Sequence, residues 1–417
     1  FLGLSARSTA TQEAAPLRQV AVVREIPTAA ADEKTEAGVV SSVPSGTPAS
    51  AAQAAESAAI STPAAASQPV AELTVVPAVP AWERIAAVKT LPIRKEVSEN
   101  RVWTVKLGNT KEEGGTRTVT HRVGGSSCMP FHLWEGEMPN RPLVALEVFD
   151  RVGEKYPAVL RDIYGSVLGN PAEMAKVCVE KYGADLISIR LDGTHPERGD
   201  ASPQQAVELV GSVLRSVGVP LIITGHNHFD KNNEVMKAIA KTFEGENLLL
   251  NWVEQDNYRT IAGAAMAYGH TVVAQSPIDV NIGKQLNILL TNMGLDADKI
   301  IMDPMTGAIG YGIEYTYSVM ERIRLTGLGG DKMLCAPIIV SPGLECAKLK
   351  EFKAPEASFP TWGDLGRRAA IWELSTATSL LYAGADILIM YHPEAAMAVQ
   401  KTIGRLLEGT GGINHGA

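Results

Sequence analysis

The chain has 417 residues, a formal net charge of -8 and 45% hydrophobic residues. The acidic charge and the lack of a basic stripe argue against nucleic acid as a partner, and no apolar run reaches the roughly 20 residues of a membrane span. Its four cysteines are scattered without CxxC spacing, so we expect buried free thiols in a reducing cytoplasm and no iron–sulfur or zinc site in this chain. They are Cys128, Cys178, Cys335 and Cys346.

The first part of the chain divides into two segments of different composition. Residues 1–80 are dominated by Ala, Pro, Ser, Thr and Val, which predicts a flexible tether, with a docking arm for a larger assembly as the alternative. Residues 81–142 are predicted to be a connector, with a short helix within 82–101, followed by a β-hairpin. The hairpin is predicted because residues 102–107 and 116–123 alternate with period two around a loop at 108–115. We expect it to cap the bottom of the domain that follows.

Residues 143–408 repeat a strand–helix unit eight times, and 409–417 form a tail. Short Val, Ile and Leu runs predict the strands, and a glycine follows many of the helices, where a left-handed residue is favoured. Eight such units predict an α/β fold of the TIM (β/α)8 barrel class. The predicted strands are 143–149, 186–191, 220–224, 248–252, 271–275, 299–302, 337–340 and 386–390. The predicted helices include 172–182, 203–217, 233–243, 258–268, 280–293, 318–328 and 365–381.

The loop after the sixth strand has the most distinctive composition. Asp303 and Pro304 end the strand, and the next eight residues, Met305 to Gly312, contain three glycines. Glycines let a backbone approach a flat or bulky ligand and free N–H groups to face it, and barrels bind ligands at the carboxyl ends of their strands. We therefore interpret this segment as a ligand-binding loop. The alternative is a turn that only reverses the chain.

Polar residues follow most of the predicted strands, where they could equally cap loops and helices. They are Asp150, Asp192, Asn251, Glu254, Asn257, Ser276, Asp303, Ser341 and His392. A His-x-His pair, His226 and His228, is a zinc-binding pattern in some barrel hydrolases. Asp303 could complete such a site, but no second pair lies on the first strand, so a metal hydrolase is disfavoured. The chain lacks GxSxG, which disfavours a serine hydrolase.

Longer motifs resemble a known family. They are Glu135-Gly-Glu, Asn140-Arg-Pro, Glu254-Gln-Asp-Asn-Tyr, Asp303 to Tyr317, Met320-Glu-Arg-Ile-Arg-Leu, Gly330-Asp-Lys-Met and His392-Pro-Glu-Ala. Over roughly residues 100 to 408 these motifs resemble the small (delta) subunit of the corrinoid iron–sulfur protein. That protein belongs to the CO dehydrogenase/acetyl-CoA synthase system. The pair His226 and His228 is not part of the family's motif, so no role is assigned to it.

The resemblance implies a function and a set of partners. A heterodimer with a large (gamma) subunit would hold a cobamide between this barrel and a domain of that subunit, which also carries the iron–sulfur cluster. The cobalt would accept a methyl group from methyl-tetrahydropterin through a separate methyltransferase. It would then deliver the methyl group to acetyl-CoA synthase, in the reductive acetyl-CoA (Wood–Ljungdahl) pathway. The chain would thus act as a subunit of a methyltransferase complex, because the corrinoid supplies the reactive atom.

The expected cofactor-binding residues come from the glycine-rich loop and from other strand ends. They are Asp303, Met305, Thr306, Gly307, Gly310, Tyr311, Gly312 and Glu314, with Glu254, Asn257, Asn251 and Asp192. We assign no catalytic residue and no metal ligand. Two alternatives stay open. One is a stand-alone pterin-dependent methyltransferase that holds the pterin with Asp192, Asn251 and Asp303. The other is a non-catalytic scaffold barrel.

Overall fold

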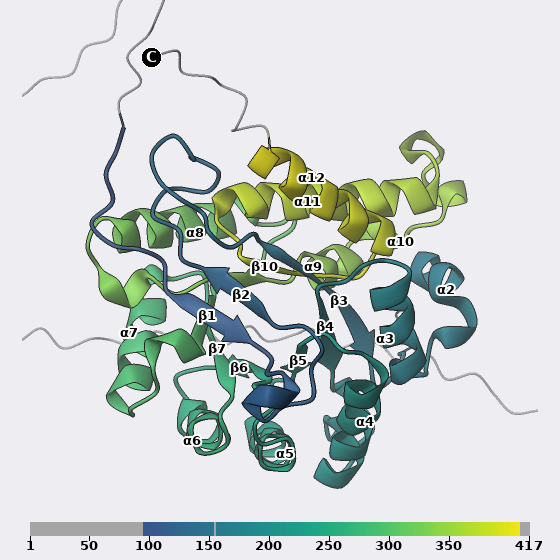
Figure 1. The fold of residues 1–417 in the computed structure, drawn as a ribbon. Coiled ribbons are helices and arrows are strands. Elements are labelled where there is room, and N and C mark those ends of the chain that lie inside the picture. The colour runs from purple at the N-terminus through teal and green to yellow at the C-terminus, as the bar shows by residue number, and fades with distance from the viewer. Residues whose placement is uncertain (1–94, 154–155, 409–417) are drawn as a thin grey trace, which may run out of the picture. The chain divides into compact units, whose positions relative to one another are not determined.

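The computed structural model describes residues 95–153 and 156–408 (Figure 1). The predicted tether and tail, and most of the predicted helix at 82–101, lie outside these ranges, while residues 95–101 form no helix. None of the helices in the described ranges has the length and hydropathy of a membrane span.

Eight parallel strands form a closed barrel, as the sequence predicts. Their order in the sheet is β8-β7-β6-β5-β4-β3-β10-β9, and all neighbours pair in parallel. The barrel closes between β8 and β9, where Met302 bridges Ile338 and its N–H donates to the carbonyl of Pro337 at 2.8 Å. The strands are β3 (Leu143–Phe149), β4 (Leu186–Arg190), β5 (Leu221–Thr224), β6 (Leu249–Val253), β7 (Thr271–Gln275), β8 (Ile300–Asp303), β9 (Ile339–Val340) and β10 (Ile387–Met390).

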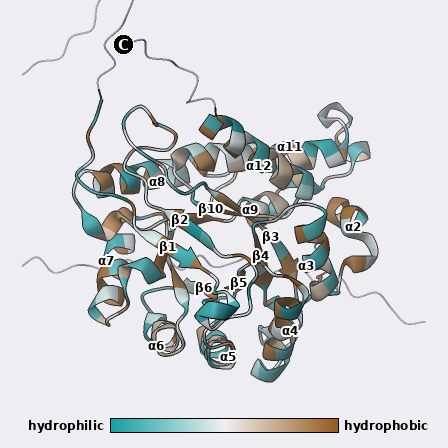
Figure 2. Cartoon of the chain, in the orientation of Figure 1, coloured by the Kyte–Doolittle hydropathy of each residue, from teal (hydrophilic) through white to brown (hydrophobic). Residues whose placement is uncertain are grey.

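Helices surround the barrel, and their inward faces are apolar while their outer faces are polar (Figures 1 and 2). This pattern follows from the 3.6-residue period of an amphipathic helix packed on a sheet. The helices are α2 (Ala158–Tyr164), α3 (Pro171–Glu180), α4 (Pro203–Ser216), α5 (Phe229–Thr242), α6 (Tyr258–Tyr268), α7 (Val280–Asn292), α8 (Ile313–Leu328), α9 (Pro342–Lys348), α10 (Lys350–Lys353), α11 (Leu365–Ala383) and α12 (Pro393–Glu408).

Two helices begin four or five residues earlier than predicted. Helix α5 starts at Phe229, because the imidazole of His228 accepts a hydrogen bond from the N–H of Lys231 and so caps the helix. Helix α8 starts at Ile313, because Gly312 turns the chain in the left-handed region at φ 93°. β-branched and aromatic residues in its first turn have modest helix propensity, which explains the late start expected from the sequence.

The barrel interior is filled in layers by alternate residues of each strand. Its lower part is an apolar cluster that includes Leu143, Ile222 and Ile387. Val105 and Val123 of the N-terminal hairpin belong to the same cluster, so the hairpin closes the bottom of the barrel. This leaves the carboxyl ends of the strands as the open end.

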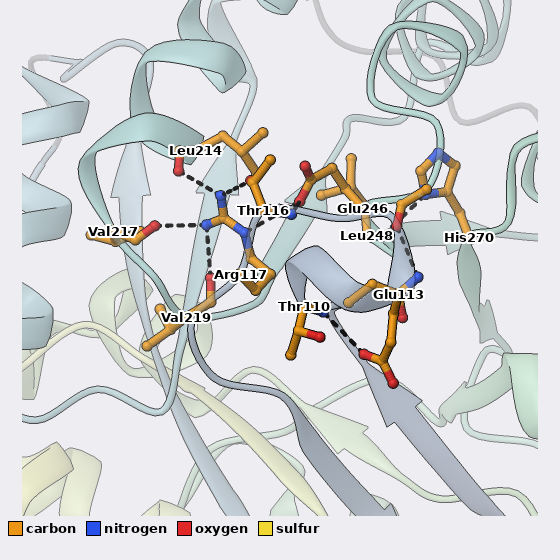
Figure 3. Close-up of polar contacts among 12 residues, drawn as sticks. Thr110, Glu113, Thr116, Arg117, Leu214, Val217, Val219, Glu246, Leu248 and His270 are labelled. Carbon is orange, nitrogen blue, oxygen red and sulfur yellow. Dashed lines mark hydrogen bonds and ion pairs between the residues drawn. The ribbon is translucent and has the colours of Figure 1, made fainter.

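The hairpin pairs β1 (Thr104–Leu107) with β2 (His121–Gly124) in antiparallel fashion. The predicted second strand, 116–123, therefore forms only from His121 onward. The residues before it lie at the bottom of the barrel, where the guanidinium of Arg117 donates to the carbonyls of Leu214 and Val217 at 2.7 Å each (Figure 3). These carbonyls end helix α4, where a cation is favourable.

Candidate functional site

The carboxyl ends of β4 to β9 surround a cavity of about 390 Å³, which we call the mouth cavity. Most of its lining residues are polar in type, and they come from strand ends, from the loops that follow them and from helix α9. The lining residues are Arg190, Thr224, Asn227, Asn251, Trp252, Glu254, Gln275, Asp303, Met305, Thr306, Ser341, Leu344, Glu345 and Lys348.

A connected layer of inward-facing polar side chains forms the floor of this region. The Ser188 hydroxyl bonds the carboxylate of Glu147 at 2.8 Å and lies 2.9 Å from the hydroxyl of Thr224. The amide of Asn251 donates to that same Thr224 oxygen at 3.1 Å. All four residues are buried, so these hydrogen bonds fix the side chains in place before any ligand arrives.

Asp303 anchors the opposite side of the floor. One of its carboxylate oxygens accepts from the amide of Gln275 and the other from the N–H of Met305, each at 2.8 Å. Burial raises the pKa of Asp303 to about 6, against the lowering effect of those two donors. The carboxyl group therefore changes charge near neutral pH, which makes it able to accept or donate to a ligand.

Asn251 keeps one hydrogen-bonding atom unused. Its Oδ1 atom is buried and has no partner among the described residues. The neighbouring Trp252 donates its indole N–H to Glu254 at 2.6 Å, and Asn257 in turn accepts from the N–H of Glu254 at 2.7 Å. An unpaired buried amide oxygen costs free energy, so a donor from a bound molecule would be stabilising there.

The structure brings together only part of the predicted cofactor-binding set. Asn251, Glu254, Asp303, Met305 and Thr306 line the mouth cavity. Asn257 lies beneath Glu254, and Asp192 lines a neighbouring cavity. The remaining predicted residues, Gly307, Gly310, Tyr311, Gly312 and Glu314, do not line the mouth cavity; they lie in the glycine-rich loop that follows Thr306 and in the first turn of helix α8.

The glycine-rich loop is folded back on itself. A side chain at Gly307 would meet the backbone of Gly312 at 2.5 Å, so this glycine is needed for the loop to close. Gly310 and Gly312 have φ of 77° and 93°, in the left-handed region that favours glycine. Tyr311 between them is 47% exposed and donates its hydroxyl to Glu351 at 3.1 Å.

Exposed apolar side chains edge the barrel mouth on this side. Met305 is 41% exposed, and Ile278 on the preceding loop is 38% exposed. The two loops are joined by a hydrogen bond from the N–H of Ile278 to the carbonyl of Pro304. We call Ile278, Met305 and Tyr311 the apolar rim.

The His-x-His pair lies beside a third histidine. The ring of His195 is 5.0 Å from that of His226 and 5.9 Å from that of His228. The Nδ1 atom of each ring accepts a backbone N–H, so a neutral ring carries its proton on Nε2. A protonated Nε2 has no lone pair with which to bind a metal. Burial and the two neighbouring rings lower the pKa of His226 to about 4. Within the described ranges, no group of three or more His, Cys, Asp or Glu residues is placed to hold a metal.

Other strand-end residues have local roles. Asp150 accepts the N–H of Gly193 at 2.8 Å, and burial raises its pKa to about 6. Ser276 and His392 are each 1% exposed and lie below the open surface. The N–H of His392 donates to the carboxylate of Glu373 at 3.0 Å.

Comparison with known proteins identifies the family. Residues 104–399 match the model of the CO dehydrogenase/acetyl-CoA synthase delta subunit. The chain belongs to this delta-subunit family. It is 38% identical over 327 residues to the acetyl-CoA decarbonylase/synthase complex subunit delta of Archaeoglobus fulgidus, covering 76% of this chain and 72% of that protein. It is 37% identical over 330 residues to subunit delta 1 of Methanosarcina thermophila, covering 77% and 75%.

Among solved structures, the chain is similar to dihydropteroate synthase of Xanthomonas albilineans. The TM-score is 0.44 and the identity 16%, with 66% of this chain and 95% of that one covered.

Several residues of this delta-subunit mouth were not singled out from the sequence, among them Arg190, Thr224, Gln275 and Lys348. The sequence contained a signal for Arg190. Arg190 ends an otherwise almost wholly apolar strand, and Glu147 interrupts another. A charged residue in a strand buried on both faces requires a partner, and these two are partners. Thr224, Gln275 and Lys348 carried no comparable signal.

Proposed function

We propose that this chain is the small subunit of a corrinoid iron–sulfur protein within an acetyl-CoA decarbonylase/synthase complex. With a large (gamma) subunit it holds a cobamide that carries a methyl group from methyl-tetrahydropterin to acetyl-CoA synthase. The observation that carries the proposal is the match to the delta-subunit family over residues 104–399. The cobamide supplies the reacting cobalt, and the chain's part is to orient it and limit access of water.

The barrel mouth fits one face of a cobamide. A corrin macrocycle with its amide side chains is too large for a cavity of about 390 Å³, which is at the lower end of small-molecule sites. The ring would instead lie across the mouth against the apolar rim. Exposed apolar side chains there would cover the flat ring, and polar groups such as Asn227 would meet its amides.

The state of the four cysteines supports the proposal that the iron–sulfur cluster is bound by the large subunit. All four are free and buried. Burial raises the pKa of Cys128 to about 11 and that of Cys178 to about 12, and it also raises the pKa of Cys335 and Cys346. Thiols held in the protonated form are poor iron ligands, since the ligand is the thiolate.

The test is the cobalt content of the heterodimer with a substituted glycine loop. Gly310→Val adds a side chain where no described residue lies within 4 Å, so it should intrude only on a molecule that lies over the glycine-rich loop. Gly269→Val is the matched control. Gly269 has φ 78° and equally open space, but it precedes β7 at the opposite end of the barrel.

Both variants should carry a similar backbone strain of about 1 to 3 kcal/mol. We expect Gly310→Val to lower the cobalt per folded heterodimer and Gly269→Val to leave it unchanged. Full cobalt in both variants would contradict the placement of the cobamide on this loop.

A second candidate is a stand-alone pterin-dependent methyltransferase. The unpaired Oδ1 of Asn251 and the carboxyl of Asp303 line one cavity, which favours a small heterocycle with both donors and acceptors. The third residue expected for this role, Asp192, lies instead in the neighbouring cavity and is paired with Arg198 at 2.7 Å. Methyl transfer to free cob(I)alamin by the chain without its partner would favour this candidate.

A further inference from the structure

A second cavity of about 420 Å³ adjoins the mouth cavity, and we call it the side cavity. It lies over the ends of β3, β4 and β10, beside helices α9 and α10. Arg190, Leu344 and Lys348 line both cavities, so one molecule can extend from one into the other. The other lining residues of the side cavity are Phe149, Arg151, Gly153, Tyr156, Pro157, Asp192, Ala347, Lys353 and Tyr391.

Arg190 is the central feature of this arrangement. It is only 7% exposed, and its Nε atom donates to Glu147 at 2.7 Å. Its two terminal amino groups make no hydrogen bond to any described residue, although a guanidinium has five N–H donors. Glu147 thus holds the guanidinium in one orientation and leaves its two terminal amino groups free to donate to a ligand. We call these two amino groups the fork of Arg190.

Two buried hydroxyls add to the unsatisfied donors. The phenol oxygens of Tyr156 and Tyr391 are buried and make no hydrogen bond of good geometry to a described residue, although the Tyr391 side chain lies near Glu147. Both residues line the side cavity with Arg190. Buried polar atoms are seldom left without a partner, so three side chains with free donors at one cavity point to a missing acceptor.

The described residues that line the side cavity carry a net positive charge. Arg151 and Lys353 line it and form no ion pair with a described residue. The acid among the lining residues is Asp192, which is paired with Arg198, while Lys348 is paired with Glu345 at 2.6 Å. Among the described residues, no acid therefore pairs with Arg151 or Lys353 beside the free donors of Arg190.

We propose that Arg190 and the side cavity bind the anionic substituent, a carboxylate or a phosphate, of a small ligand whose uncharged polar head lies in the mouth cavity beside Asn251 and Asp303. A planar guanidinium suits both anions, because it donates two parallel hydrogen bonds to a pair of oxygens. The two cavities suit a small elongated molecule and are too small for a corrin. The inference does not depend on whether the barrel also covers a cobamide.

The test uses three probes that share one planar head. They are 6-hydroxymethylpterin, which is uncharged, pterin-6-carboxylate, and the phosphate monoester of 6-hydroxymethylpterin. Binding to the full chain is measured by calorimetry without a partner subunit. We expect at least one anionic probe to bind about tenfold more tightly than the uncharged probe, and the tighter of the two identifies the anion.

Arg190→Lys removes the fork but keeps the charge, so the anionic probe should bind it no more tightly than the uncharged one. Lys401→Ala removes an exposed charge from helix α12, on the outside of the barrel, and serves as the matched control. It should retain the affinity of the unmodified chain.

Lys353→Ala provides a variant whose folding is not in question, because Lys353 is only partly buried and forms no ion pair with a described residue. It should weaken the anionic probe alone. Three outcomes would each overturn the proposal: no binding of any probe, equal binding of charged and uncharged probes, or unchanged anion affinity in both Arg190→Lys and Lys353→Ala.

Discussion

Arg190 and Glu147 face each other on neighbouring strands inside the barrel, with Nε of the arginine donating to Oε2 of the glutamate at 2.7 Å. Glu147 is fully buried and its other oxygen accepts from Ser188. Because the pair lies at the carboxyl ends of β4 and β3, it separates the apolar interior from the polar mouth. Its loss should therefore affect stability as well as the site.

Removing one member of this pair should be strongly destabilising. Glu147→Ala leaves the guanidinium buried without its counter-charge, and we expect a loss of about 3 to 5 kcal/mol in the free energy of unfolding. The double variant Glu147→Ala/Arg190→Met should lose less than the sum of the two single changes, because it leaves no unpaired charge. Urea unfolding of the four proteins measures this coupling.

An exposed pair provides the control for that cycle. Arg101 and Glu137 form an ion pair at 3.0 Å, but their side chains are 58% and 71% exposed. Glu137→Ala should cost less than about 1 kcal/mol. A similar cost for Glu137→Ala and Glu147→Ala would mean that burial does not set the strength of the Arg190 pair.

Arg117 should hold the hairpin connection to the barrel bottom. Arg117→Ala leaves the carbonyls of Leu214 and Val217 without this donor, and the carboxylate of Glu246 keeps only the N–H of Thr116. We expect a loss of about 3 kcal/mol or more, since each buried unsatisfied group costs about 1 to 3 kcal/mol. Arg122→Ala, at an exposed position on β2, should change the unfolding free energy by less than about 0.5 kcal/mol. Equal effects of the two changes in urea unfolding would count against this role.

The buried carboxyl of Glu373 should make stability depend on pH. It accepts the N–H groups of Tyr391 and His392, and burial raises its pKa from 4.5 to about 8. Because the pKa is higher in the folded state, the stabilisation is complete below pH 4.5 and is lost as the pH rises toward 8. Within this window the slope is up to about 1.4 kcal/mol per pH unit.

Glu373→Gln should remove this part of the pH dependence, while Glu394→Gln, at an exposed position in the first turn of α12, should retain it. Urea unfolding at several pH values between 5 and 8 provides the comparison. Parallel pH profiles for Glu373→Gln and the unmodified chain would show that this carboxyl does not titrate in that range.

The N-terminal segment should be dispensable for folding. Residues 1–80 carry too few large apolar side chains to offset the entropy of ordering them. A chain that starts at Trp82 should therefore melt at the same temperature as the full chain, within error, by circular dichroism. A clear fall in melting temperature would show that this segment packs on the barrel.

The sequence was sufficient to predict the barrel and its open end. Strands buried on both faces require continuous apolar runs, and the helices between them end at glycines, so both signals are local. Because parallel strands point the same way, Asn251 and Asp303 could be expected at one end of the barrel, and both line the mouth cavity. These predictions needed only the order of the elements.

The tertiary structure decided which side chains converge. Arg190 meets Glu147 through the register of β4 on β3, and His195 meets His226 across two loops. Met305 lines the mouth cavity, whereas Gly307 to Gly312 do not. The two parts of the loop look alike in the sequence, so this difference could not be predicted. Strand register and loop direction depend on packing between segments distant in the chain, and no local pattern of residues encodes them.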